Sequence, residues 1–98
     1  MNKKEKIKRM KDVRSLIDQV DDKILPLIVR RSKLVNKALE LKLYKNEIID
    51  TKRINQILKK IGSKSKKMKA NPKLIKSIWK GMIQNFIEHE KKEFKKRK

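Results

Sequence analysis

One apolar pattern, extending over residues 12–44, constrains the fold of this chain more than any other feature. Its apolar side chains recur every three or four residues, which is the period of an amphipathic α-helix. Asp12 is a candidate N-cap residue, and Pro26, which lacks a backbone donor, should bend the helix. Because the apolar phase continues on both sides of Pro26, we predict one long, bent helix. The side chains that make the pattern are Val13, Leu16, Ile17, Val20, Ile24, Leu27, Ile28, Leu34, Val35, Ala38 and Leu41.

A second and shorter helix is expected after a connection at residues 45–49. Its apolar positions are Ile54, Ile57, Leu58 and Ile61. Gly62 and Ser63 should end it, because glycine readily takes the left-handed conformation that follows many helices. Residues 63–70 are then expected to form a lysine-rich loop.

A third helix should begin at Asn71 and Pro72, since asparagine caps helices and proline is favoured at the first helical position. Strand-like alternation and internal repeats are absent from the sequence. We therefore predict an all-α fold of three helices with one long N-terminal helix. It forms a single domain over 1–98, with a basic N-terminal extension at 1–11 and a basic tail at 91–98. The apolar positions of the third helix are Leu74, Ile75, Ile78, Trp79, Met82, Ile83, Phe86 and Ile87.

The composition favours an oligomer. In 98 residues, 43% are charged and 37% are hydrophobic, so a monomer can bury little apolar area against the entropy cost of folding. The chain has no cysteine, which excludes disulfides and thiolate metal sites and fits a reducing cytosol. The charged start leads into no apolar segment of the kind found in secretory signals, and the sequence has no apolar run of about 18 residues. We expect a cytoplasmic protein without a membrane partner.

The formal net charge of +20 raises the question of nucleic acid, because clustered cations neutralise phosphates. Most of the 31 cations are lysine, however, and isoleucine is the leading apolar residue, a pairing that an AT-rich genome encodes at tolerant positions. We therefore interpret most of the charge as a solvated surface. The informative cations are the few that lie on otherwise apolar faces.

Five polar residues have spacings suited to a small dianion: Arg14, Arg31, Lys42, Asp50 and Arg53. Arg31 and Lys42 are eleven residues apart, about three helical turns, so they share the apolar face, where each needs an anion. Arg14 lies 17 residues before Arg31, roughly 25 Å along a straight helix. It is therefore either unrelated to that pocket or belongs to the pocket of a partner chain. Asp50 and Arg53 are neighbours on the second helix, and an ordinary surface pair is the alternative interpretation.

Together these residues resemble the all-α chorismate mutase family over residues 13–90. The opening Ile-Asp-x-x-Asp, the double arginine that follows and the later Asp-x-x-Arg are the most specific parts. The matching segments are Val13-Arg14-x-x-Ile17-Asp18-x-x-Asp21-x-x-Ile24-Leu25, Arg30-Arg31-x-x-Leu34, Lys42, Ile48-x-Asp50-x-x-Arg53-x-x-x-Ile57-Leu58, and Ile78-Trp79-x-x-Met82-Ile83-x-x-Phe86-Ile87-x-x-Glu90.

The resemblance implies an intertwined homodimer that rearranges chorismate to prephenate without metal or cofactor. By position, Arg14 would reach from the partner chain to one substrate carboxylate, and Arg31 would bind the other. Lys42 would hold a carboxylate and the ether oxygen, Asp50 would accept from the ring hydroxyl, and Arg53 would complete the cationic wall. Arginine suits this task because its planar fork pairs with a carboxylate through two hydrogen bonds. Phe86 and Ile87 are expected to contact the substrate.

Three positions depart from the family pattern. Ile54 stands where many members have Glu, Phe86 where they have Ser, and Glu90 where they often have Gln. The first two resemble the isochorismate–pyruvate lyase branch of the same fold, which yields salicylate and pyruvate, whereas Asp50 favours the mutase. An ionised Glu90 would repel a developing oxyanion, so Glu90 should act when protonated and activity should then rise as the pH falls. In the alternative interpretation, Glu90 faces solvent beside His89 and has no role.

Two further alternatives remain. A basic module could bind nucleic acid or an acidic partner, with binding that falls steeply with salt and survives Arg31→Ala. The cations concerned are Lys59, Lys60, Lys64, Lys66, Lys67 and the tail at 91–98. A catalytically weak, regulatory relative is also compatible with the departures. We regard a nucleic-acid partner as the less favoured of these interpretations.

Overall fold

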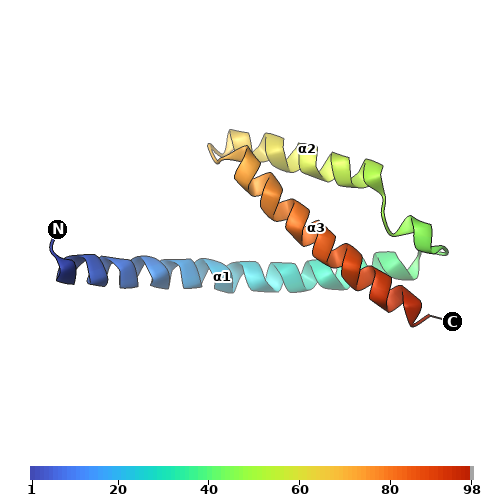
Figure 1. The fold of residues 1–98 in the computed structure, drawn as a ribbon, viewed down its shortest axis with the longest axis horizontal. Coiled ribbons are helices and arrows are strands. Elements are labelled where there is room, and N and C mark those ends of the chain that lie inside the picture. The colour runs from blue at the N-terminus through green and yellow to red at the C-terminus, as the bar shows by residue number, and fades with distance from the viewer. Residues whose placement is uncertain (98) are drawn as a thin grey trace. The chain divides into compact units, whose positions relative to one another are not determined.

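The computed structural model describes residues 1–97, and these form three α-helices and one short 3₁₀ helix (Figure 1). The helices are α1 (Lys3–Glu40), α2 (Thr51–Lys67) and α3 (Pro72–Lys95), with the 3₁₀ helix η1 (Lys45–Glu47) between α1 and α2. No strand occurs in the described part of the chain. The prediction of an all-α fold with one long N-terminal helix is therefore confirmed.

The long helix begins earlier than the sequence pattern predicts. The side chain of Asn2 accepts a hydrogen bond from the backbone N–H of Glu5 at 2.9 Å, so Asn2 caps the helix. Asp12 lies inside α1, and its prediction as the N-cap was wrong. The physical reason is that residues 3–11 are mostly lysine, glutamate, arginine and methionine, which have high helix propensity. Pro26 also lies inside α1, so the prediction of one helix across it is confirmed.

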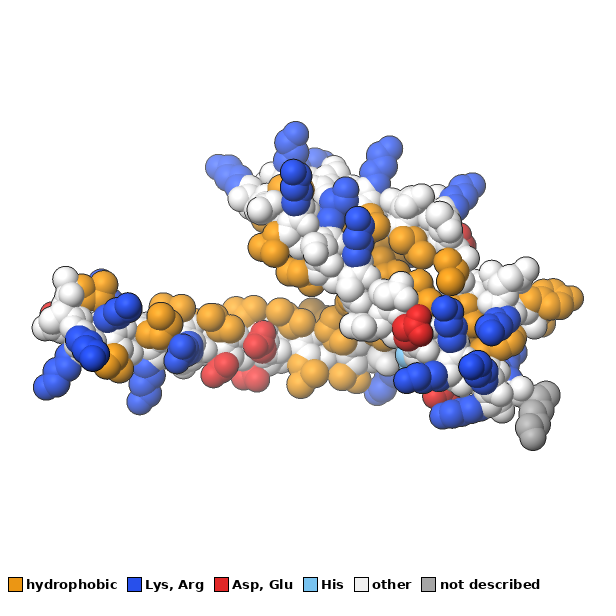
Figure 2. All heavy atoms as spheres, viewed as in Figure 1, with side chains coloured by type: hydrophobic (Ala, Val, Ile, Leu, Met, Phe, Trp, Pro, Cys, Tyr) orange, Lys and Arg blue, Asp and Glu red, His pale blue; other side chains and the backbone are white. Residues whose placement is uncertain are grey.

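The chain divides into two compact units, one from Met1 to Leu34 and one from Val35 onward. The first unit is the larger part of α1, and none of its residues is buried in the single chain. The side chains of Val13, Leu16, Ile17 and Val20 are between 51% and 59% exposed. Figure 2 shows hydrophobic side chains along the visible face of this helix. A long apolar face is therefore left uncovered within one chain.

The second unit contains the apolar core. Here α2 and α3 pack against each other, and the last turn of α1 adds Leu39. Trp79 and Phe94 are partly buried and pack against the core. The buried apolar residues are Leu39, Ile48, Leu58, Ile83 and Ile87.

The helix α2 continues beyond Gly62, so the prediction that Gly62 and Ser63 end it was wrong. Instead, Gly62 lies where α2 packs against Lys76 of α3, and a Cβ placed on Gly62 would come within 2.9 Å of the Lys76 side chain. Glycine there permits close packing of the lysine stem. The helix ends at Lys67, and Lys69 takes the left-handed conformation with a φ of 59°. The backbone N–H of Ala70 then donates to the carbonyl of Ser65 at 2.9 Å, which closes the turn.

The start of α3 agrees with the sequence. Pro72 is its first residue, and the side chain of Asn71 accepts hydrogen bonds from the backbone N–H groups of Lys73 and Leu74. Residues 91–95, within the segment expected as a basic tail, continue the helix. This places Glu90, Phe94 and Arg97 along one end of α3.

Candidate active site

A buried ion pair joins the segment after α1 to the helix α3. The Nζ of Lys42 donates to Oε2 of Glu90 at 2.7 Å, and the two side chains are 22% and 9% exposed. Glu90 is therefore buried, and the expectation in the alternative interpretation that it faces solvent was wrong. A charge-assisted hydrogen bond of this length offsets the cost of removing a carboxylate from water.

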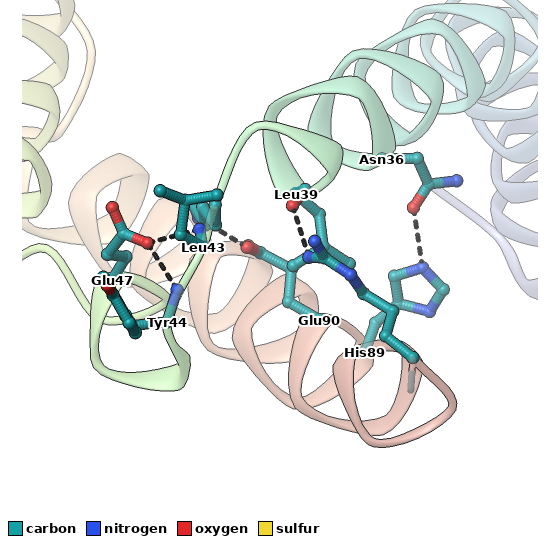
Figure 3. Close-up of polar contacts among 9 residues, drawn as sticks. Asn36, Leu39, Leu43, Tyr44, Glu47, His89 and Glu90 are labelled. Carbon is teal, nitrogen blue, oxygen red and sulfur yellow. Dashed lines mark hydrogen bonds and ion pairs between the residues drawn. The ribbon is translucent and has the colours of Figure 1, made fainter.

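The loop that carries Lys42 is fixed by its own hydrogen bonds. The backbone N–H of Lys42 donates to the carbonyl of Leu39 at 3.0 Å, which tightens the end of α1. Beyond it, one carboxylate oxygen of Glu47 accepts from the backbone N–H groups of Leu43 and Tyr44 at 2.6 and 2.7 Å. Figure 3 shows Glu47 turned toward these two residues. Lys42 thus projects from a short, hydrogen-bonded segment.

A second polar contact connects α3 to the end of α1. The Nε2 atom of His89 lies 3.0 Å from Oδ1 of Asn36 (Figure 3). No role for His89 was predicted from the sequence, because a contact between residues 53 positions apart leaves no local signal. This contact and the Lys42–Glu90 pair lie on successive residues of α3.

Asp50 and Arg53 lie at the start of α2, and both are exposed. Asp50 is the N-cap residue, and its Oδ1 accepts from the backbone N–H of Arg53 at 3.0 Å. The two residues are therefore linked through the backbone of Arg53 in the described structure. The other carboxylate oxygen of Asp50, Oδ2, takes no part in this hydrogen bond.

The apolar candidates have different surroundings. Ile87 is 6% exposed and belongs to the core, whereas Phe86 is partly buried on the same helix. Ile54 is also partly buried and packs against the core. Packing in the core therefore explains why the residues at positions 54 and 87 are apolar.

Arg14 and Arg31 belong to the first unit. Arg14 is exposed on α1, in a shallow apolar surface with Ile7 and Met10, and Arg31 is partly buried. The pairing described above, of Lys42 with Glu90, belongs entirely to the second unit.

Residues 1–97 contain no group of three or more histidine, cysteine, aspartate or glutamate side chains that could hold a metal ion. None of the helices described is long and apolar enough to cross a membrane.

The described part of the chain is all-α, and an ammonium–carboxylate pair joins the segment after α1 to α3. Residues 13–91 match the sequence pattern of the chorismate mutase type II family. The chain therefore belongs to the chorismate mutase type II family, and it is an enzyme of the isomerase class. The resemblance inferred from the sequence is confirmed. A comparison with curated proteins gave no match.

Proposed function

We propose that the protein converts chorismate to prephenate by a Claisen rearrangement. The observation that carries this proposal is the pair of Lys42 with Glu90, because it supplies a partly buried ammonium group at a position where the resemblance implies a contact with the substrate. In this reaction one C–O bond breaks as one C–C bond forms, with no covalent enzyme intermediate and no proton transfer. Rate enhancement comes from holding the compact conformer and stabilising the charge that grows on the ether oxygen.

Each site residue has a distinct task in this proposal. Arg31 binds one carboxylate through its planar fork, and Lys42 binds the other carboxylate and the ether oxygen. Asp50 accepts from the ring hydroxyl through the oxygen that does not cap α2, and Arg53 adds positive charge beside it. Phe86 contacts the ring of the substrate, with Ile87 in the core directly after it in sequence. Glu90 lies beside the ether oxygen through its contact with Lys42.

We further propose that two copies form the functional enzyme and that Arg14 is supplied by the partner chain. Support comes from the uncovered apolar face of α1, whose exposed valine, leucine and isoleucine side chains would be costly to leave in water. A self-complementary interface along such a helix is typical of two-fold dimers. The pocket of each chain would then be completed by an arginine from the other.

Isochorismate–pyruvate lyase activity is a second candidate, because Phe86 brings an apolar ring to a position where mutases have serine. Both substrates are dianions of similar shape, so the same arginines would serve either reaction. The assay that separates them is turnover of purified protein with chorismate and with isochorismate, across acidic to neutral pH. Prephenate supports the mutase, whereas salicylate and pyruvate move the assignment to the lyase.

A matched pair of arginine variants tests the site itself. Arg31→Ala should lower kcat/KM by about 10²–10³ because a charge-assisted contact to the substrate is lost. Arg30→Ala removes the same charge from the neighbouring, exposed position and should leave turnover near that of the wild type. Equal losses in both variants, or turnover of neither substrate by the wild type, would contradict the proposed function. Helical circular dichroism should be unchanged in both.

A further inference from the structure

The carbonyl oxygen of Leu39, in the last turn of α1, accepts two hydrogen bonds. One comes from the backbone N–H of Lys42 and the other from Nη1 of Arg97, each at 3.0 Å. The last carbonyl groups of a helix have no partner within the helix, and a positive charge at that end is favourable. Arg97 therefore holds the same carbonyl group that fixes the backbone of Lys42.

Arg97 is itself held in place by an aromatic ring. Its guanidinium carbon lies 4.8 Å from the centroid of the Phe94 ring, a distance typical of a cation–π contact. Phe94 is partly buried and packs against the core that includes Leu39. The guanidinium group thus has a defined position although Arg97 as a residue is exposed.

The end of α3 therefore reaches Lys42 by two routes. Glu90 contacts the ammonium group directly, and Arg97 contacts the carbonyl group that receives the Lys42 amide. Glu90 and Phe94 are four residues apart and so share one face of α3, and Arg97 follows one turn later. The side chain of Lys42 is thereby connected to α3, and its backbone to the residues that directly follow α3.

We propose that Arg97 is a positioning residue for Lys42, held by Phe94 and acting through the carbonyl group of Leu39. The inference rests on the proposed function, in which Lys42 contacts the substrate. It concerns a residue beyond the segment that matches the family, which ends at residue 91. The segment at 91–98, predicted from the sequence to be a basic tail, thus supplies a side chain that orders the active site.

The neighbouring cations do not share this geometry. Lys96 pairs with Glu93 at 3.1 Å, and Lys91 pairs with Glu88 at 3.5 Å, both within α3 or at its end. These exposed, local pairs contribute little to stability. Lys96 therefore offers a matched control for Arg97, with the same charge one residue away and no contact with Leu39.

The first experiment measures hydrogen exchange at the backbone amide of Lys42, by NMR, in the wild type, Arg97→Ala and Lys96→Ala. Loss of Arg97 should loosen the last turn of α1 and speed exchange of this amide at least about ten-fold, while amides in the middle of α3 keep their rates. Lys96→Ala should leave the Lys42 amide unchanged. Unchanged exchange in Arg97→Ala, or equal acceleration in both variants, would overturn the inference. This measurement does not depend on turnover, so it stands even if the proposed reaction fails.

The second experiment measures kcat and KM with chorismate in the same proteins. A misplaced Lys42 ammonium weakens stabilisation of the transition state more than substrate binding, so Arg97→Ala should lower kcat about 10-fold to 100-fold with a smaller change in KM. Arg97→Lys keeps one charged donor and should recover part of the loss. His89→Ala removes the other contact between α3 and the end of α1, to Asn36, and serves as the structural control. A loss in kcat as large in His89→Ala as in Arg97→Ala would show a general packing effect and would overturn the inference.

Phe94→Leu keeps an apolar side chain in the core but removes the ring beneath the guanidinium group. It should reproduce the faster exchange of the Lys42 amide seen in Arg97→Ala, and it provides a second route if Arg97→Ala does not fold. If the Lys42 amide of Phe94→Leu exchanges at the rate of the wild type, Arg97 positions Lys42 without the ring. That result would overturn the role proposed for Phe94.

Discussion

The ammonium group of Lys42 and the carboxylate of Glu90 lie 2.7 Å apart, and they are brought together from positions 48 residues apart in the chain. Both groups belong to the site proposed for the substrate. Without substrate, Glu90 therefore accepts a hydrogen bond from the same ammonium group that would contact the ether oxygen and a substrate carboxylate. Binding has to replace this contact or share the lysine with it.

Substitution of Glu90 by glutamine, a neutral amide, should weaken the competition between residue 90 and the substrate for the Lys42 ammonium group. An ionised Glu90 repels charge that grows on the ether oxygen, whereas a protonated Glu90 can donate a hydrogen bond to it. We therefore expect Glu90→Gln, which carries no charge and keeps an N–H donor, to raise kcat/KM for chorismate. Because a donor to a developing oxyanion is worth about 10²–10³ in rate, Glu90→Gln should be at least several-fold faster than the wild type at neutral pH. A variant slower than the wild type at every pH would show that the carboxylate acts in its ionised form.

Loss of one partner of the pair should cost stability, and loss of both should restore it. Lys42→Met leaves the mostly buried carboxylate of Glu90 unpaired and should lower the free energy of unfolding by about 1–3 kcal/mol. Lys42→Met with Glu90→Met removes both charges and should recover most of that loss, yet remain inactive. Urea unfolding at one fixed protein concentration, together with the chorismate assay, separates the two effects. If the double variant regained activity as well as stability, Lys42 would have no catalytic role.

Mixing two inactive variants tests whether Arg14 is supplied by a partner chain. Arg14→Ala and Lys42→Ala should each be inactive alone. If Arg14 crosses between chains, a mixed dimer has one pocket in which both Arg14 and Lys42 are intact. Random mixing after unfolding and refolding should then recover about a quarter of the wild-type activity. Absence of recovery, with mixed dimers demonstrated by mass spectrometry, would place Arg14 in its own chain's pocket or outside the site.

The turn after α2 contains a position where glycine should be more stable than the native residue. Lys69 has a φ of 59°, a left-handed conformation that side chains with a Cβ adopt at a cost. Lys69→Gly should therefore raise the free energy of unfolding by up to about 1 kcal/mol. As the control, Lys60→Gly places glycine inside α2 at an exposed position and should lower it by about 1 kcal/mol. Thermal or urea unfolding would contradict the interpretation if both substitutions were destabilising.

Local signals account for the parts of the fold that the sequence predicted. The apolar period of residues 12–44 and the Asn71-Pro72 start each depend on a few neighbouring residues. The start is present in the structure, and α1 follows the period as far as Glu40, so the predicted end of this helix was four residues too late. The errors at the start of α1 and at Gly62 have different origins. The start of α1 depends on a cap at Asn2 that the apolar pattern does not reach, and the continuation of α2 past Gly62 depends on packing against Lys76.

The sequence alone determined the helical class, the long apolar face and the identity of the charged residues on it, because helical period and capping are encoded over one or two turns. It named Lys42 and Glu90 as members of one site only through the family pattern. Tertiary structure decided that these two residues pair, and that Arg97 reaches a carbonyl group 58 residues earlier. Such contacts depend on how α3 packs against the end of α1, which follows from the sum of many weak apolar contacts. The spacing of neighbouring residues in the sequence does not predict these contacts.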